Sequence, residues 1–255
     1  MVCAAFENEK LTPGAAAKLY GLANFLESGM FGKLGRAGLN PIKDRAQAKG
    51  QQAMTAGIRS SLELVRELML LRPRRSFRVG QYHGERFVVA SDAAYEAGVG
   101  TGGFLVVMRP NQAEESRHAR IVELPQELYE IWGEQVTYIA QLELYMILAA
   151  VTSFANDFRD KRGVWFVDNI AALMALVRGR SNSESLDQMA LRIHAALFSI
   201  RAWVYFEWVS SEANWSDGIS RDGLADQWQQ RHSVQPGKCI GVPMLLRLPV
   251  RAAVT

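Results

Sequence analysis

The hydrophobic residues in the first part of the chain follow a helical period. After Thr12-Pro13, a common helix start, the run AAAKLYGLANFL predicts one helix, and a second helix is predicted from about Arg45 to Leu71. Asn40-Pro41 predicts a turn between them. The basic run RPRRSFR, residues 72–78, is a candidate linker. We therefore expect residues 1–78 to form a helical segment.

From about residue 80 the pattern changes to short apolar runs of the kind that form strands. The predicted strands are Arg86 to Ala93, Phe104 to Met108, Ala119 to Leu124, Val164 to Val167, and Ala202 to Val209. The glycines between the first two strands predict a tight turn and a hairpin; they are Gly98, Gly100, Gly102 and Gly103. This turn lacks the Gly-Lys-Ser/Thr of a phosphate-binding loop.

Helical runs separate the later strands. The predicted helices extend from Gln126 or Glu134 to Phe154, from Ile170 to Val177, from Ser183 to about Ile200, and from Trp215 to Arg221. A strand that is entered from a helix joins its sheet by a crossover and lies parallel to its neighbour, whereas the first three strands form an antiparallel meander. The expected fold is α/β, with a five-stranded mixed sheet flanked by helices over residues 79–225 and a tail over residues 226–255.

Composition agrees with such a fold and excludes several classes of protein. A chain of 255 residues that is 49% hydrophobic can bury a sizeable core. Its net charge of +3 is compatible with nucleic acid but does not by itself indicate it. Cys3 and Cys239 lie far apart, so neither a zinc site nor a disulfide framework is predicted.

The sequence also carries a prediction about compartment. No apolar run reaches the ~18 residues of a membrane-spanning helix, so we expect no membrane partner. The first residues, MVCAAFENEK, show no signal-peptide pattern. Together with the sparse cysteines, this predicts an intracellular location, cytoplasmic or nuclear.

Four acidic residues occupy unusual places in the pattern. In VWFVDNIAAL an apolar strand ends on Asp168, and in RFVVASDAAYE the first strand is interrupted by Asp92. Glu143 falls inside the apolar stripe of a helix, and Asp217 begins the helix in NWSDGIS. Each has an ordinary explanation: a turn residue for Asp92, a helix cap for Asp168, a stripe edge for Glu143, a first-turn acid for Asp217.

Taken together, the four acids predict one site. Asp92 and Asp168 would lie near the ends of neighbouring central strands, with Glu143 on the helix between them and Asp217 after the last strand. Clustered carboxylates repel one another in a low dielectric, so a site that keeps them ionised needs cations. Oxygen ligands without His or Cys suit Mg²⁺ or Mn²⁺. Two ions about 4 Å apart would require the Asp92 and Asp168 carboxylates to lie within about 8 Å of each other.

The segments that carry the acids resemble a known family. VASDAAYE, IAQLELYMILAAV, VWFVDNIAAL and EANWSDGISR are similar to the four-acid site of the ribonuclease H-like fold. The last two segments resemble the RNase H domain of retroelement reverse transcriptases, in particular the DIRS-like retrotransposon group, over about residues 84–222. The run LTPGAAAKLYGLANFLESGMFGKLGRAGLNPI resembles the helical thumb or connection that precedes RNase H in such polyproteins. The Tyr-x-Asp-Asp polymerase motif is missing, which suggests a C-terminal part of a polyprotein or a gene fragment.

The resemblance implies hydrolysis of the RNA strand of RNA–DNA hybrids with two Mg²⁺ (or Mn²⁺) ions. Asp92 and Asp168 would bind metal, Glu143 would bind one ion and orient the attacking water, and Asp217 would complete the second metal position. Such enzymes recognise hybrid shape and the 2′-hydroxyl rather than base sequence. The implied partners are the hybrid and the rest of a reverse transcriptase.

Three polar residues beside the acids are candidate contacts to the substrate backbone: Ser91, Tyr95 and Asn169, although turn or cap roles explain them as well. Many relatives carry a His in the loop before the last acid, and here that loop reads WVSSEAN. Two other interpretations therefore stay open. One is a catalytically weak or inactive nucleic-acid-binding remnant. The other is a 3′–5′ exonuclease or integrase-like strand transferase, which the Asn-x-x-Asp-x-Ile-Ser-Arg ending and Glu143 make less fitting.

Overall fold

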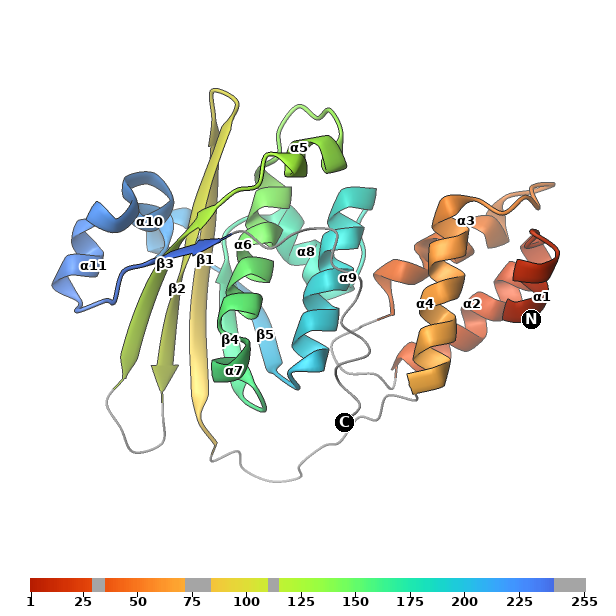
Figure 1. The fold of residues 1–255 in the computed structure, drawn as a ribbon, viewed down its shortest axis with the longest axis horizontal. Coiled ribbons are helices and arrows are strands. Elements are labelled where there is room, and N and C mark those ends of the chain that lie inside the picture. Colours follow the sequence, from red (N-terminus) through yellow and green to blue (C-terminus); the bar gives the residue numbers. More distant parts are fainter. Residues whose placement is uncertain (29–34, 72–83, 110–114, 241–255) are drawn as a thin grey trace.

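One mixed sheet forms the centre of the molecule (Figure 1). The computed structural model describes residues 1–28, 35–71, 84–109 and 115–240. The strands are β1 (Arg86–Glu96), β2 (Val99–Arg109), β3 (Ser116–Glu123), β4 (Arg162–Val167), β5 (Trp203–Trp208) and β6 (Lys238–Ile240). Their order is β5-β4-β1-β2-β3-β6. β1, β2 and β3 are antiparallel, whereas β4 joins β1, and β5 joins β4, in parallel.

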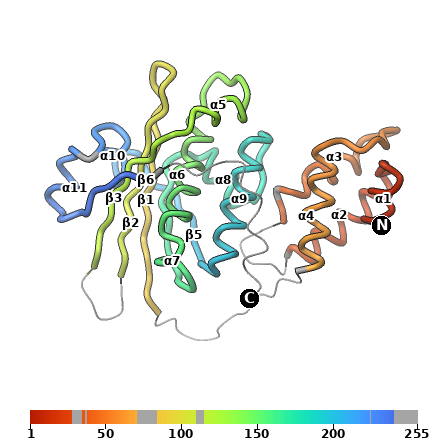
Figure 2. Tube along the Cα trace, viewed as in Figure 1, coloured from red at the N-terminus to blue at the C-terminus, as the bar shows by residue number. Residues whose placement is uncertain are grey.

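Helices cover both faces of the sheet and extend beyond it. They are α1 (Val2–Glu7), α2 (Pro13–Ser28), α3 (Asn40–Gln47), α4 (Ala56–Leu71), α5 (Glu127–Trp132), α6 (Ile139–Ser153), α7 (Ala155–Phe158), α8 (Ile170–Arg178), α9 (Glu184–Ser199), α10 (Asp217–Asp222) and α11 (Gln227–Arg231), with short 3₁₀ turns η2 (Ala37–Leu39), η3 (Ser211–Ala213) and η4 (Gly223–Ala225). Helices α6, α8 and α9 lie on one side of the sheet and α10 on the other (Figures 1 and 2). Among the described residues, no helix combines the length and the apolar character that a membrane crossing needs.

The predicted fold class is confirmed. Three antiparallel strands followed by parallel strands, with flanking helices and a helical extension before them, make a ribonuclease H-like α/β fold. A sixth strand, β6, extends the predicted five: Lys238 to Ile240 pair in parallel with Ile121 to Glu123 of β3. Three residues are too few to show the alternation that predicts a strand. Residues 238–240 of the predicted tail thus belong to the sheet.

The glycine-rich turn is shorter than the sequence predicted. Only Ala97 and Gly98 make the turn, both with positive φ (50° and 83°), and the other glycines are in β2. A Cβ on Gly102 would lie 2.6 Å from the sulfur of Met146 in α6, and a Cβ on Gly103 would lie 2.6 Å from a backbone oxygen of β3. These glycines therefore allow close packing against the middle of β2.

The helix predicted from Arg45 to Leu71 is two helices, so that prediction was wrong. α3 ends at Gln47, and Gly50 adopts a φ of +76° that interrupts the helical path. Thr55 then caps α4, because its hydroxyl accepts a hydrogen bond from the Ile58 amide at 3.3 Å. The predicted turn at Asn40-Pro41 is the start of α3. The candidate linker, residues 72–78, lies outside the described residues.

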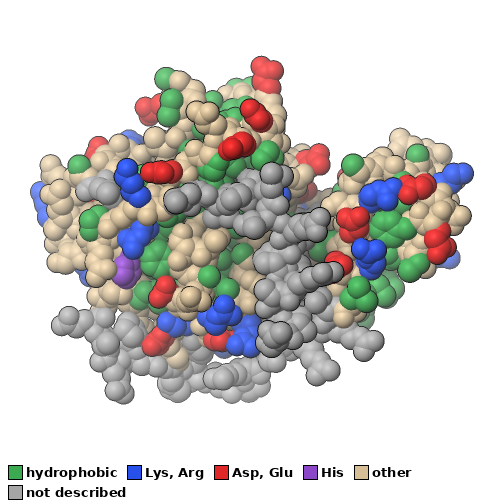
Figure 3. Space-filling view, viewed as in Figure 1, with side chains coloured by type: hydrophobic (Ala, Val, Ile, Leu, Met, Phe, Trp, Pro, Cys, Tyr) green, Lys and Arg blue, Asp and Glu red, His purple; other side chains and the backbone are tan. Residues whose placement is uncertain are grey.

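Helices α1 to α4 enclose a hydrophobic core of their own and contact the rest of the molecule through α9 (Figure 1). Leu64 and Leu68 of α4 pack against Ala195 of α9, and Asn40 donates a hydrogen bond to the Asp187 carboxylate. On the face drawn in Figure 3, basic and acidic side chains of the described residues are interspersed. The helical extension is thus docked on the helix layer, on the far side of that layer from the sheet.

Candidate metal centre

The predicted acids meet where the central parallel pair comes apart. β1 and β4 are paired from Arg86–Arg162 to Ala90–Phe166, and the pairing ends there. Asp92 and Asp168 each follow two residues later. The carboxyl ends of parallel strands lie at the same edge of a sheet. Both carboxylates therefore emerge at this end of the β1–β4 pair.

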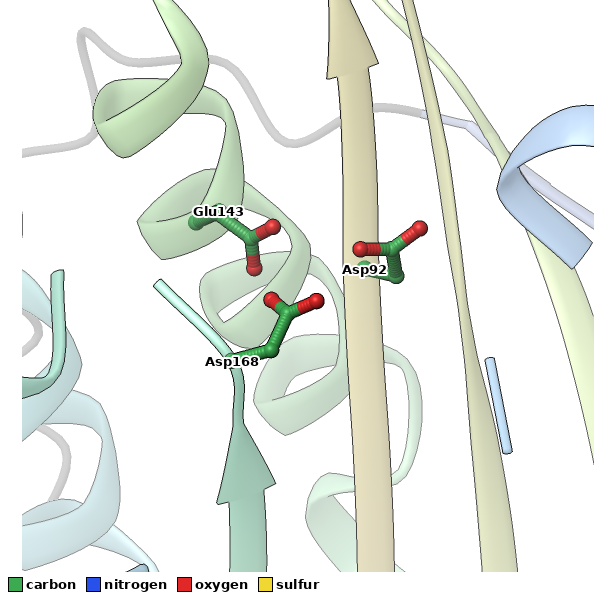
Figure 4. Close-up of side chains that lie close together, drawn as sticks. All are labelled: Asp92, Glu143 and Asp168. Carbon is green, nitrogen blue, oxygen red and sulfur yellow. The ribbon is translucent and has the colours of Figure 1, made fainter. Parts of the chain in front are cut away.

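Glu143 reaches this point from the adjacent helix. Its Oε1 accepts a hydrogen bond from the Ala93 amide of β1 at 3.1 Å. Figure 4 shows the carboxyl groups of Asp92, Glu143 and Asp168 facing one another from β1, α6 and the end of β4. One carboxylate oxygen from each of the three lies within 4.8 Å of the others. The spacing is thus well inside the limit that a shared two-metal centre requires.

The fourth acid, Asp217, lies at the border of this cluster. It is the first residue of α10 and forms an ion pair with Arg221 at 3.0 Å. It does not belong to the group of three acids that could share an ion, but its charge raises the pKa of Asp92. The structure therefore brings three of the four predicted acids together and places Asp217 nearby.

Two residues that the sequence did not single out as site residues support the cluster. The Ser220 hydroxyl donates a hydrogen bond to the Asp92 carboxylate. The buried Asn214 amide donates to the Ser91 carbonyl at 3.2 Å, and its oxygen accepts from the amide of Ser216 at the same distance. Both lie in the segment EANWSDGISR that carried the resemblance. The Asn-x-x-Asp-x-Ile-Ser pattern thus encodes the attachment of the α10 segment to β1.

Burial and mutual repulsion disfavour full ionisation of the carboxyl groups in the cluster. Burial raises the pKa of Asp92 to about 6, against the lowering effect of the Ser220 hydrogen bond, and the Asp168 charge raises it further. Burial also raises the pKa of Glu143 well above its ordinary value, followed by the charges of Asp92 and Asp168. Without a cation, protonation is the way in which such a group lowers its charge.

The donor set fits a hard divalent cation. Within the described part of the chain, Glu143 Oε2 is buried and has no hydrogen-bond partner. The three clustered groups offer only carboxylate oxygens, the ligands that Mg²⁺ and Mn²⁺ prefer. A cation would satisfy the orphaned oxygen and offset the mutual repulsion of the carboxylates. The cluster is therefore compatible with divalent metal binding.

Asp168 is not the cap of the helix that follows it. The N-cap of α8 is Asn169, whose side-chain oxygen accepts from the Ala172 amide at 3.0 Å. The capping explanation therefore applies to Asn169, and Asp168 is left to face the other acids. The apolar strand β4 is thus followed first by an acid of the cluster, Asp168, and then by the N-cap of α8, Asn169.

The other two candidate substrate contacts also have structural partners. Ser91 is fully buried, and its hydroxyl accepts a hydrogen bond from the Trp165 indole at 3.0 Å. Tyr95 is half-buried, with its ring edge-on to Tyr138 at 5.3 Å. In this structure both side chains contact neighbouring aromatic residues close to the acids.

Comparisons with known proteins find similarity to solved structures only. No protein-family model and no curated protein matches the sequence. Similar solved structures include RNase H1 from the halophilic archaeon Halobacterium salinarum NRC-1 (17% identity, 55% of this chain and 98% of that chain, TM-score 0.40). An N-terminal RNase H domain from Mycobacterium tuberculosis (16%, 57% and 98%, 0.37) and LC9-RNase H1, a type 1 RNase H with the type 2 active-site motif (16%, 69% and 88%, 0.42), are also similar. The fold class follows from the order and direction of the strands.

Proposed function

We propose that this protein is a metal-dependent nuclease of the ribonuclease H type, which hydrolyses the RNA strand of RNA–DNA hybrids. The observation that carries the proposal is the convergence of Asp92, Glu143 and Asp168 within 4.8 Å at the end of the central strands. The acids come from three separate elements, and the buried Glu143 Oε2, which has no hydrogen-bond partner, is suited to bind a cation. Ordinary turn and cap roles do not explain such a meeting.

In the proposed site, Asp92 and Asp168 would hold the ions, Glu143 would contribute to one of them, and Asp217 would complete the second position. Two divalent ions, when bound, supply an activated water and stabilise the leaving oxygen of a phosphodiester. The Ala93 amide fixes one Glu143 oxygen and leaves the other to face the ion or the attacking water. Ser220 orients the Asp92 carboxylate. Recognition of the RNA strand would depend on its 2′-hydroxyls.

The test is cleavage of an end-labelled RNA–DNA hybrid with Mg²⁺ or Mn²⁺. The wild-type protein should cut the RNA strand, and should leave duplex DNA intact. Asp168→Asn should lose about 10²-fold or more in rate, a loss typical for removing a group that stabilises transition-state charge. Asp222→Asn, at an exposed position at the end of α10, is the matched control and should keep full activity. Equal activity of Asp168→Asn and wild type would refute the mechanism.

We further propose that the chain derives from the RNase H part of a retroelement reverse transcriptase of the DIRS-like group. Its support is the pair of segments VWFVDNIAAL and EANWSDGISR, together with the helical segment α1 to α4 ahead of the sheet, where a thumb or connection would stand. Sequencing of the genomic region is the test. An upstream reading frame with a Tyr-x-Asp-Asp motif is the expected result, and an unrelated upstream gene with no reverse transcriptase remnant would contradict it.

A second candidate function is hybrid binding with little or no cleavage. The loop from Trp208 to Asn214 contains no His, and Asp217 is engaged by Arg221, which favour slow or lost chemistry. Hybrid binding by the wild-type protein without any product in Mg²⁺ or Mn²⁺ would support this function over the first.

A further inference from the structure

Two tryptophans expose large parts of their surfaces beside Asp168. Trp208, at the end of β5, is 50% exposed, and its indole N–H donates to the Asp168 carbonyl oxygen at 3.3 Å. Trp215 is 40% exposed and lies two residues before Asp217. Its ring meets Phe166, two residues before Asp168, edge-on with the centroids 6.1 Å apart. Both indoles are therefore held next to the acidic cluster.

The two indoles lie on opposite sides of the strand that carries Asp168. Trp208 is paired with Val167 in the β4–β5 register, so its side chain leaves on the side of Val167, which belongs to the core under α6 and α8. Phe166 points to the other side, because side chains alternate along a strand, and Trp215 contacts it there. Trp208 and Trp215 thus bracket the end of β4, from which Asp168 extends toward the other acids.

Neither ring is loosely attached. The Trp208 N–H is satisfied by the Asp168 carbonyl, which leaves the ring surface as its free part. Trp215 lies nearly parallel to Trp228, with an interplanar angle of 13° and centroids 6.3 Å apart, and Trp228 stacks on His232 at 4.1 Å. Rigid aromatic rings lose little conformational entropy when they bind a partner.

The chemistry of the site indicates what these rings would contact. The acidic cluster repels a phosphate backbone until cations are bound, so a nucleic-acid substrate needs attraction that does not depend on charge. Aromatic side chains provide it, since every sugar offers an apolar face against which an indole can pack, and a base does so wherever it is unstacked, whatever the sequence. An enzyme that recognises hybrid shape rather than base sequence requires contacts of this kind.

We propose that Trp208 and Trp215 bind the nucleic-acid substrate on either side of the scissile phosphate, each indole packing against a base or a sugar. The inference rests on the proposed nuclease function, because it takes the neighbouring acids as the reactive centre. The two tryptophans are substrate-binding residues that set the register of the strand over Asp168. The occupant is one strand of an RNA–DNA hybrid.

The first measurement is the affinity for a short RNA–DNA hybrid in Ca²⁺, with a gel to verify that the RNA stays intact. Trp208→Ala and Trp215→Ala should each weaken binding about fivefold or more, the loss expected for removing one stacking contact. Trp208→Phe and Trp215→Phe should retain most of the affinity, because they keep an aromatic face. Phe25→Ala, which removes an exposed aromatic ring from α2, is the control and should bind like wild type.

The second measurement separates binding from folding and from chemistry. In Mg²⁺ the two alanine variants should raise KM with a smaller change in kcat, while circular dichroism and thermal unfolding confirm the fold. A hybrid that carries 2-aminopurine near the cut should show fluorescence quenching with the wild-type protein and less with the alanine variants. If the tryptophans had only a structural role, the alanine variants would change the unfolding temperature but would not raise KM selectively or reduce the fluorescence quenching.

The outcomes distinguish the inference from the proposed function. Cleavage by wild type with unchanged affinity and KM in both alanine variants would overturn the inference and leave the nuclease intact. Hybrid binding without cleavage, weakened in both variants, would overturn the nuclease and support the binding role. No hybrid binding by wild type would overturn both. Concentration-dependent self-association that the alanine variants abolish, with hybrid affinity unchanged, would assign the rings to a contact between copies instead.

Discussion

At the scale of single residues, burial in the folded chain disfavours the ionised form of the clustered acids. The pKa of Asp92 rises from 3.8 to about 6 on folding, mainly because the carboxyl group is buried. A group whose pKa is raised in the folded state contributes most to stability below its unfolded pKa. That contribution is lost as the pH rises from about 4 through about 6. At neutral pH the ionised Asp92 carboxylate therefore destabilises the metal-free folded protein.

Replacing Asp92 by Asn should accordingly stabilise the metal-free protein at pH 8, while abolishing metal-dependent cleavage. The expected gain in free energy of unfolding is about 1–3 kcal/mol, from a shift of roughly two pKa units at 1.36 kcal/mol each. Urea unfolding in EDTA at pH 8 and pH 4 measures it, and the difference from wild type should largely vanish at pH 4. A less stable variant at pH 8, with Asp222→Asn unchanged as the control, would show that burial of the charge is not the dominant effect.

Addition of Mg²⁺ or Mn²⁺ should raise the unfolding temperature of the wild-type protein. A cation that binds only the folded state stabilises it by mass action, by about 1.4 kcal/mol at ten times the dissociation constant. Because protons compete with the ion for Asp92 and Glu143, the shift should be larger at pH 8 than at pH 6. Thermal scans with and without the ion measure this. Glu143→Gln and Asp168→Asn should show a reduced shift, and an equal shift in both variants would place the ion elsewhere.

At the scale of elements, the close approach of α6 and β3 to β2 depends on glycines in β2. Gly103→Ala should destabilise the protein by about 1–3 kcal/mol, because the new Cβ would lie 2.6 Å from the Arg120 carbonyl oxygen of β3. Gly21→Ala, in the interior of α2 with nothing within 4 Å, is the matched control and should stabilise by about 0.5–1 kcal/mol. Chemical denaturation measures both. Equal stabilities of the two variants would show that the strand moves to accommodate the methyl group.

The helices and strands also show which structural features the hydrophobic pattern of the sequence can predict. The strands before and after Asp168 and the capping sequence at Asn169 were predictable, because apolar runs, turns and caps act over a few residues. The orientation of α6 was not, since every residue from Gln141 to Val151 is buried and the helix has no polar face to mark its outside. Val136, which lies inside the helix predicted from Gln126 or Glu134 to Phe154, precedes α6 and is fully exposed.

At the scale of the whole molecule, the helical extension packs against the part that contains the sheet through a small apolar contact. Leu64 and Leu68 of α4 pack on Ala195 of α9. Leu68→Asp should loosen this contact, because an unpaired carboxylate would be buried in it. Limited proteolysis should then release a helical fragment faster than from wild type, while metal-induced stabilisation of the acidic site is retained. Unchanged proteolysis would mean that other contacts secure the extension, and Met69→Asp, at an exposed position of the same helix, is the control.

By itself, the sequence determined the five longer strands, the alternation of strand and helix around them, and the identity of the acids, because periodicity and chain connectivity act locally and leave few topologies. Only the tertiary structure decided that Glu143 turns inward to meet Asp92 and Asp168, that Asp217 is shared with Arg221, and that two tryptophans bracket the site. The meeting of residues from separate elements depends on how α6 packs and where the β1–β4 pairing ends. Long-range packing fixes these features, and no short stretch of sequence carries them.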